Sequence, residues 1–199
     1  ERNAPPFGAD VGLKPRAGQA ELQWAGARAH NRWLADFCAE DPHRRLGLAV
    51  IPALYSVEET IKEIHWAKKN NMKGVFFPAI TDGFDMYNHT KYYPVWELLQ
   101  DYKMPLHFHS GGSPDYDMTQ PGWIGTYLCE FAFYMTRPMW SMMFGGVFEE
   151  YPELKVMFVE AGGEFWFPWM IELMDIRASA KHTSGKLGDY NANMSMKPS

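Results

Sequence analysis

Four short, mostly apolar segments alternate along the chain with stretches in which apolar residues have helical spacing. The segments are residues 46–50, 74–77, 105–109 and 156–160, each four or five residues long. Apolar runs of this length are typical of β-strands that are buried on both faces. Strands that alternate with helices form a parallel sheet, because each helix carries the chain back to the start of the next strand. The sequence therefore predicts an α/β fold.

The first helical stretch covers residues 21–39. Ala29, Trp33 and Phe37 fall four positions apart in it, so we expect them to form the apolar stripe of a helix.

Capping residues and prolines mark the ends of later helices. Ser56 and Glu59 form a capping box, in which the serine accepts a backbone N–H and the glutamate reaches back. Pro138 is expected to interrupt a helical stretch that runs from about residue 124 to residue 150. Pro168 is expected to open the last helix.

Two architectures accommodate such an alternation, namely an open doubly wound sheet and part of a (β/α) barrel. No G-x-G-x-x-G or P-loop sequence follows any of the predicted strands, which disfavours a nucleotide-binding sheet. A complete barrel needs eight strands and typically about 250 residues. We therefore expect a partial TIM barrel over residues 21–180, preceded by an irregular segment (1–20) and followed by a polar loop tail (181–199).

Charge and composition exclude several classes of protein. The 19 basic and 24 acidic residues give a net charge of −5, whereas nucleic-acid binding requires a basic surface. The most apolar stretch, residues 131–148, is interrupted by Arg137 and Pro138 and is too short to cross a bilayer. Two cysteines are too few for a disulfide scaffold, so we expect a reducing compartment, the cytoplasm. The oligomeric state stays open.

Two histidines stand at the end of the third predicted strand. Side chains alternate along a strand, so His107 and His109 share one face and Phe108 takes the other. Near the mouth of a barrel such imidazoles could bind Zn²⁺, Fe or Mn, and they could equally be hydrogen-bonded core residues. His109 is nearer the mouth and is the better candidate ligand. His107 lies about 6–7 Å deeper and is expected to support a ligand from behind or to pack in the core.

Glu160 ends the fourth predicted strand. A buried carboxylate without a partner would cost several kcal/mol, so it should be paired, hydrogen-bonded or bound to a metal. Its functional roles would be general base or direct ligand. The alternative is a cap on the backbone N–H groups of Gly162 and Gly163. The loops after the strands carry further polar candidates for substrate contact, namely Asp82, Asp85, His89, Asp115 and Asp117.

Several segments resemble the amidohydrolase-related family of metal-dependent TIM-barrel enzymes, in particular its aminocarboxymuconate-semialdehyde and resorcylate decarboxylase branch. The most specific segment is residues 145–163, Gly-Gly-Val-Phe-Glu-Glu-Tyr-Pro-Glu-Leu-Lys-Val-Met-Phe-Val-Glu-Ala-Gly-Gly. Residues 29–38 resemble the helix before the family's third strand, and residues 104–112 resemble its fifth strand. The likeness covers about residues 24–175.

The resemblance implies a distorted (β/α)₈ barrel with a divalent metal, usually zinc, at its mouth. The family's ligands are a His-x-His on strand one, a histidine on strand five, which His109 matches, and an aspartate on strand eight. Glu160 occupies the strand-six position, which is often a histidine with an acid–base role. The chain then corresponds to strands three to six, without the first His-x-His or the final aspartate. Such an open piece is expected to leave two unpaired strand edges and to be inactive alone.

The function implied is that of a metal-dependent hydrolase or non-oxidative decarboxylase (carboxy-lyase) acting on a small carboxylated or cyclic organic substrate. His109 would bind the metal, which we expect to be Zn²⁺, and Glu160 would move a proton or orient the ligands. Two alternatives stay open. One is a non-catalytic barrel fragment or interaction module with packing histidines. The other is a metal-free enzyme that pairs Glu160 with a loop acid.

Overall fold

The centre of the molecule is a sheet of four parallel strands. The computed structural model describes residues 20–79, 81, 83–109, 116–179 and 195–199. The strands are β1 (Leu48–Val50), β2 (Gly74–Phe77), β3 (Leu106–His109) and β4 (Val156–Val159). Their order in the sheet, β1-β2-β3-β4, is their order along the chain. A (β/α) barrel has this order, whereas the strand order of a doubly wound sheet reverses. The predicted partial TIM barrel is confirmed.

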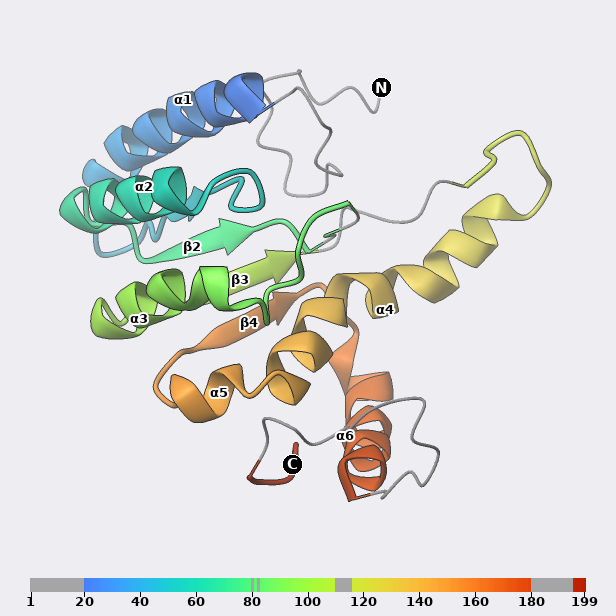
Figure 1. Cartoon of the computed structure of the whole chain (residues 1–199). Coiled ribbons are helices and arrows are strands. Elements are labelled where there is room, and N and C mark those ends of the chain that lie inside the picture. Colours follow the sequence, from blue (N-terminus) through green and yellow to red (C-terminus); the bar gives the residue numbers. More distant parts are fainter. Residues whose placement is uncertain (1–19, 80, 82, 110–115, 180–194) are drawn as a thin grey trace.

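Helices connect the strands and cover one side of the sheet, as α2, α3 and α5 do in Figure 1. The helical elements are α1 (Ala20–Ala39), α2 (Val57–Lys69), η1 (Thr90–Tyr92), α3 (Tyr93–Asp101), α4 (Trp123–Phe144), α5 (Val147–Glu150) and α6 (Gly163–Ser179). No helix among the described residues is long and apolar enough to cross a membrane. The predicted irregular segment and most of the predicted polar tail lie outside the described residues.

The helix-facing side of the sheet forms the hydrophobic core. Of the strand residues that point to this side, Ala49, Val75, Leu106 and Phe108 are fully buried, and Val156 and Phe158 of β4 are partly buried. The Phe108 ring packs against the rings of Tyr87 and Phe158, with centroid distances of 5.3 Å in both cases. Burial on this side fixes the register of the strands, because a shift by one residue would turn these apolar side chains to the opposite face.

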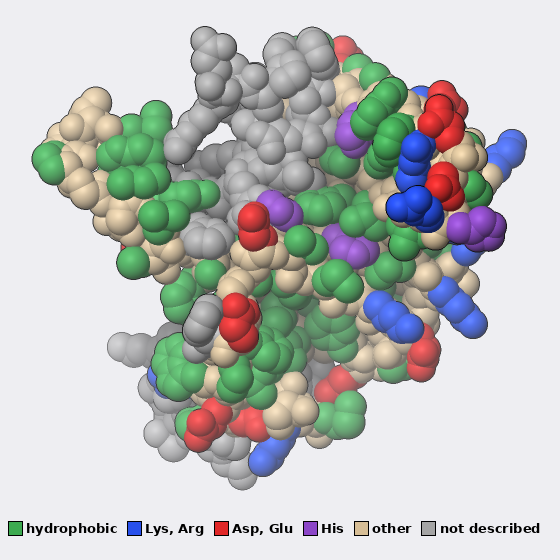
Figure 2. Space-filling model, turned by 180° about the vertical axis from the view of Figure 1, so that it is seen from behind, with side chains coloured by type: hydrophobic (Ala, Val, Ile, Leu, Met, Phe, Trp, Pro, Cys, Tyr) green, Lys and Arg blue, Asp and Glu red, His purple; other side chains and the backbone are tan. Residues whose placement is uncertain are grey.

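The other side of the sheet carries the two histidines. Phe76, His107 and Met157 are register partners on adjacent strands and form one row on this side. Figure 2 looks at the molecule from behind and shows histidine and acidic side chains next to each other among apolar side chains. Met157 is 53% exposed. In a closed barrel this side faces the interior, where side chains of all strands fill the space.

The predicted break at Pro138 is wrong, because α4 continues through this residue from Trp123 to Phe144. A proline inside a helix costs about 3 kcal/mol. Met135, Met139 and Met142 lie around it at helical spacing and are all buried. Each buried methionine side chain contributes about 1.5–3 kcal/mol, so together they outweigh the proline.

The predicted apolar stripe of α1 is not its buried face. Trp33 and Phe37 are 59% and 43% exposed, whereas Ala27, Asn31 and Ala35 are buried. These smaller side chains allow the helix to approach β1 closely enough for the Asn31 side chain to hydrogen-bond with the backbone of that strand. Close packing and a polar contact therefore decide the orientation of this helix, and Trp33 and Phe37 remain at the surface although Trp24 is buried.

Two glycines, one within α4 and one directly after it, should respond to replacement by alanine with opposite changes in stability. A Cβ atom added at Gly145 would lie 2.4 Å from Asn88 Cβ and 2.8 Å from the Ser141 carbonyl oxygen. We expect Gly145→Ala to lower the free energy of unfolding by about 1–3 kcal/mol. A Cβ atom added at Gly125 meets nothing within 4 Å. Gly125→Ala should therefore raise it by about 0.5–1 kcal/mol, because alanine is the better helix former. Denaturant unfolding of both variants measures these changes in the free energy of unfolding. Changes of the same sign and size would contradict the prediction.

Candidate active site

Two of the predicted site residues meet at the carboxyl end of the sheet. His109 is the last residue of β3, and Glu160 directly follows β4, the neighbouring strand. The Nε2 atom of His109 lies 3.2 Å from the Oε2 atom of Glu160. Their side chains are 31% and 69% exposed. The pair is therefore partly enclosed and still accessible to a small molecule, at the end of the sheet where α/β barrels carry their active sites.

The backbone at Glu160 has an unusual conformation. Its φ angle is 61°, in the left-handed region, and Gly162 follows with a φ of 57°. The left-handed conformation costs a residue with a side chain about 1–2 kcal/mol, and glycine almost nothing. Such strain in a residue other than glycine is concentrated at functional sites, because stability alone would favour glycine there.

The turn after Glu160 is fixed by the helix that follows it. The indole N–H of Trp166 donates a hydrogen bond of 2.6 Å to the carbonyl oxygen of Ala161. Helix α6 begins at Gly163, so the prediction that Pro168 opens this helix is wrong. Because Trp166 lies in the first turn of the helix, it can bond back to the turn and hold Glu160 beside His109.

The strain at Glu160 predicts a difference between two of its variants. Glu160→Gln removes the charge and keeps the unfavourable φ, whereas Glu160→Gly removes both. We expect the glycine variant to be more stable than the glutamine variant by about 1 kcal/mol. Thermal or denaturant unfolding of the two proteins measures the difference. A glutamine variant that is as stable as the glycine variant would show that the backbone is not strained.

Phe76 of β2 lies against both imidazoles. Its ring centroid is 6.5 Å from that of His107, with nearly parallel planes, and 5.8 Å from that of His109. His107 is buried, and its Nδ1 atom donates to the carbonyl oxygen of Val75 at 3.2 Å. His107 thus packs on the same side of the sheet as His109, two residues further from the carboxyl end of β3. Phe76 is not among the residues predicted for the site. The signal in the sequence is an aromatic residue on the strand that precedes the histidines.

Local contacts account for the described polar residues of the loops. His89 caps η1 by accepting the backbone N–H of Lys91. The Lys91 ammonium group lies 3.0 Å from the Asp85 carboxylate and lowers the pKa of that carboxyl group through hydrogen bonding and charge. Hydrogen bonds from Thr119 lower the pKa of Asp117. Asp82 and Asp115 lie outside the described residues.

The donor atoms of His109 and Glu160, an imidazole nitrogen and a carboxylate oxygen, are of types that bind divalent metals. An imidazole nitrogen and a carboxylate oxygen that share one ion at bond lengths near 2.1 Å lie about 3.0–3.4 Å apart, and the observed separation is 3.2 Å. In number, two donors fall short of the three protein ligands of a catalytic metal site. Within the described part of the chain, no group of three or more His, Cys, Asp and Glu residues could hold an ion. The described residues therefore form part of a site at most.

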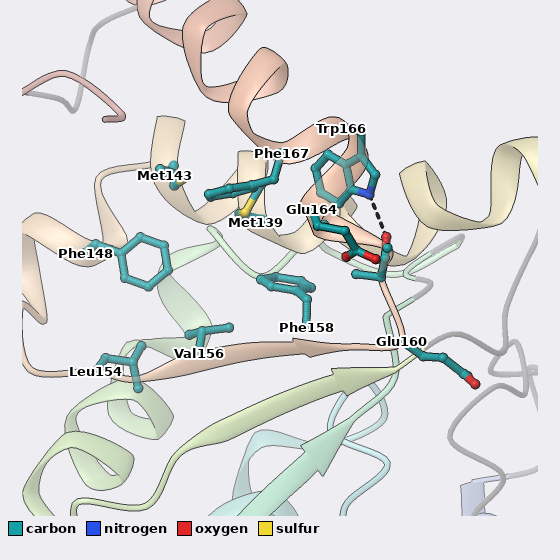
Figure 3. Close-up of a pocket in the computed structure, with 13 residues that line it drawn as sticks. Met139, Met143, Phe148, Leu154, Val156, Phe158, Glu160, Glu164, Trp166 and Phe167 are labelled. Carbon is teal, nitrogen blue, oxygen red and sulfur yellow. Dashed lines mark hydrogen bonds between the residues drawn. The ribbon is translucent and has the colours of Figure 1, made fainter.

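An apolar cavity of about 930 Å³ adjoins the turn after β4 on the helix-facing side of the sheet. Val156 and Phe158 of β4 and Trp166 and Phe167 of α6 contribute to its wall. Figure 3 shows Glu160 at one end of this cavity with its carboxylate directed away from the apolar walls. The cavity and the His109–Glu160 pair thus lie on different sides of β4, so the cavity is not the space in front of the pair.

Comparison with known proteins identifies the family. Residues 9–183 match the sequence pattern of the amidohydrolases. The chain belongs to the amidohydrolase family. The predicted resemblance to this family is thereby confirmed.

Solved structures share the fold of this amidohydrolase-family chain. A 2,6-dihydroxybenzoate decarboxylase from Rhizobium matches with 21% identity and a TM-score of 0.63 over 88% of this chain and 54% of that one. A 5-carboxyvanillate decarboxylase from Novosphingobium aromaticivorans, complexed with manganese and a nitrobenzoic acid, matches with 22% identity and a TM-score of 0.66 over 86% and 50%. A putative amidohydrolase from Staphylococcus aureus matches with 19% identity and a TM-score of 0.65 over 85% and 56%. The chain thus spans about half the length of these structures.

Proposed function

We propose that this chain supplies His109 and Glu160 to the active site of a metal-dependent amidohydrolase-family enzyme. The enzyme acts on a small carboxylated or cyclic organic substrate. It either removes carbon dioxide from this substrate or hydrolyses it. The observation that carries the proposal is the 3.2 Å contact between the two side chains at the carboxyl end of the sheet. Membership of the family and the strained backbone at Glu160 support it.

The roles of the two residues follow from their chemistry. His109 binds the metal through its imidazole, and Phe76 holds the imidazole ring from one side. A bound divalent metal would polarise a substrate oxygen or lower the pKa of a water molecule. Glu160 accepts or returns a proton beside His109, which is a role that a positioned carboxyl group can perform.

Zinc remains our prediction for the metal, with manganese as the competing ion. Two of the structurally similar decarboxylases are described with manganese. A site of imidazole and carboxylate donors accepts either ion. We expect the 199-residue chain alone to be inactive, because two donors do not hold an ion tightly.

A panel of aromatic acids tests the reaction. The natural full-length protein, loaded with Zn²⁺ or Mn²⁺, is incubated with 2,6-dihydroxybenzoate and 5-carboxyvanillate in ¹⁸O-labelled water. A decarboxylase releases carbon dioxide and leaves a product with one carboxyl group fewer. A hydrolase incorporates ¹⁸O into its product, and amide and ester substrates extend the panel for that case. A protein that binds no divalent metal would favour the non-catalytic alternative, in which the histidines only pack as His107 does.

A further inference from the structure

The outer edge of β1 is closed at one residue, Val50, whereas the sequence predicted two unpaired strand edges. β1 is the terminal strand of the sheet and pairs with β2 on one side only. On its other side, the backbone N–H of Val50 donates to Asn31 Oδ1 at 2.8 Å. Asn31 Nδ2 donates to the carbonyl oxygen of Val50 at 2.9 Å. Both hydrogen-bonding groups of this residue are thus satisfied by one side chain of α1.

Asn31 bonds to the two groups of Val50 that a neighbouring strand would otherwise pair with. Alternate residues of a strand direct their N–H and C=O groups to opposite sides. Ile51 donates to Phe76 of β2 at 2.9 Å, so the groups of the preceding residue, Val50, point away from the sheet. A side-chain amide has one donor group and one acceptor, as a peptide group does, and can replace the peptide of an adjacent strand.

A buried network fixes the orientation of the Asn31 amide. Asn31 is fully buried, and its Nδ2 atom also donates to Glu63 Oε1 at 3.0 Å. Glu63 is 2% exposed and forms ion pairs with Arg32 and, at 3.5 Å, with Arg28. Because a carboxylate accepts only, it requires the NH₂ group of the amide on its side. The oxygen is then left to face the N–H of Val50.

We propose that Asn31 closes the edge of β1 by standing in for a residue of an adjacent β-strand. A strand from a second copy of the chain or from a longer form of the protein cannot pair with Val50 while this amide is in place. Exposed strand edges promote association between chains, so a closed edge protects the sheet on this side. In a complete barrel the hydrogen-bond ladder would be interrupted at Val50. This proposal does not depend on the proposed function.

Residue-resolved amide hydrogen exchange of the full-length protein tests the proposal through two neighbouring amides of one strand. The Val50 amide is bonded to Asn31, and the Ile51 amide is bonded to β2. In the unmodified protein we expect both to be protected. In Asn31→Ala, exchange at Val50 should accelerate at least tenfold more than exchange at Ile51. A residue that acts only through packing would accelerate both alike.

Two further variants separate the hydrogen bond from general destabilisation. The double variant Asn31→Asp with Glu63→Gln keeps an oxygen that accepts the Val50 N–H and avoids two adjacent buried carboxylates, because the amide introduced at position 63 can donate to the new carboxylate. The ratio of the two exchange rates should then change less than threefold. Gln23→Ala removes another buried amide from α1 and should leave the ratio unchanged. If Asn31→Ala does not fold, the unmodified protein and the double variant decide the matter. An unprotected Val50 amide in the unmodified protein, or equal acceleration in Asn31→Ala, would overturn the proposal.

Discussion

Replacing His109 by alanine in the full-length protein should weaken the binding of the divalent metal by more than about 100-fold. Loss of residues that merely support a metal ligand typically costs 10–100-fold in affinity, and a direct ligand should exceed this. Activity should fall in parallel, because the proposed chemistry requires the metal. Metal analysis of the purified protein, together with titration of the metal-free form, measures the effect.

A histidine elsewhere on the surface provides the control. His65 of α2 is exposed, and its Nδ1 atom lies 2.8 Å from the Tyr102 hydroxyl. His65→Ala also removes an imidazole, but from α2 and not from the His109–Glu160 pair. This variant should leave metal content and activity unchanged. If His109→Ala retained its full complement of metal, the proposed role of this imidazole would have to be abandoned, and the non-catalytic alternative would gain support.

Replacing Phe108 by alanine should lower the free energy of unfolding by about 3–5 kcal/mol. Phe108 is fully buried, and its ring fills the space between Tyr87 and Phe158. The substitution removes this apolar surface and leaves a cavity that the rigid strands on either side cannot close. Against a typical total stability of about 5–15 kcal/mol, this loss is a large fraction.

Phe133→Ala is the matched control for Phe108→Ala. The Phe133 side chain, on α4, is 44% exposed. Its loss should cost less than about 1 kcal/mol, because substitutions near the surface have small effects. Urea unfolding of the two variants gives the comparison. Similar losses for both would mean that the helix-facing side of β3 is not the core of the molecule.

Strands were more predictable than helix orientation. Each predicted apolar segment contains a strand, because a short run of apolar residues between turns has few alternatives to a buried strand. The alternation of side chains also separated Phe108 from the two histidines correctly. By contrast, Trp33 and Phe37 misled the interpretation of α1, since their spacing is helical and their face is exposed. Spacing alone does not show which of two apolar faces a neighbouring strand will cover.

The candidate site was predictable in its residues and not in its geometry. The position of His109 and Glu160 at strand ends follows from the sequence, since carboxyl ends of parallel strands meet at one edge of the sheet. Their contact depends on the register of β3 against β4 and on the left-handed turn at Glu160. The support from Phe76 and the bond from Asn31 to β1 likewise join segments that are distant in sequence.

By itself the sequence determined the class of the fold, the order of its strands and helices, and the family of the protein. These properties depend on local patterns of apolar and polar residues, which a linear chain displays directly. Only the tertiary structure decided that α4 passes through Pro138, that a positive φ at Glu160 is maintained, and that Asn31 forms hydrogen bonds with Val50 of β1. Each of these features is unfavourable or unrecognisable locally. Each is stabilised by contacts with residues that only folding brings close.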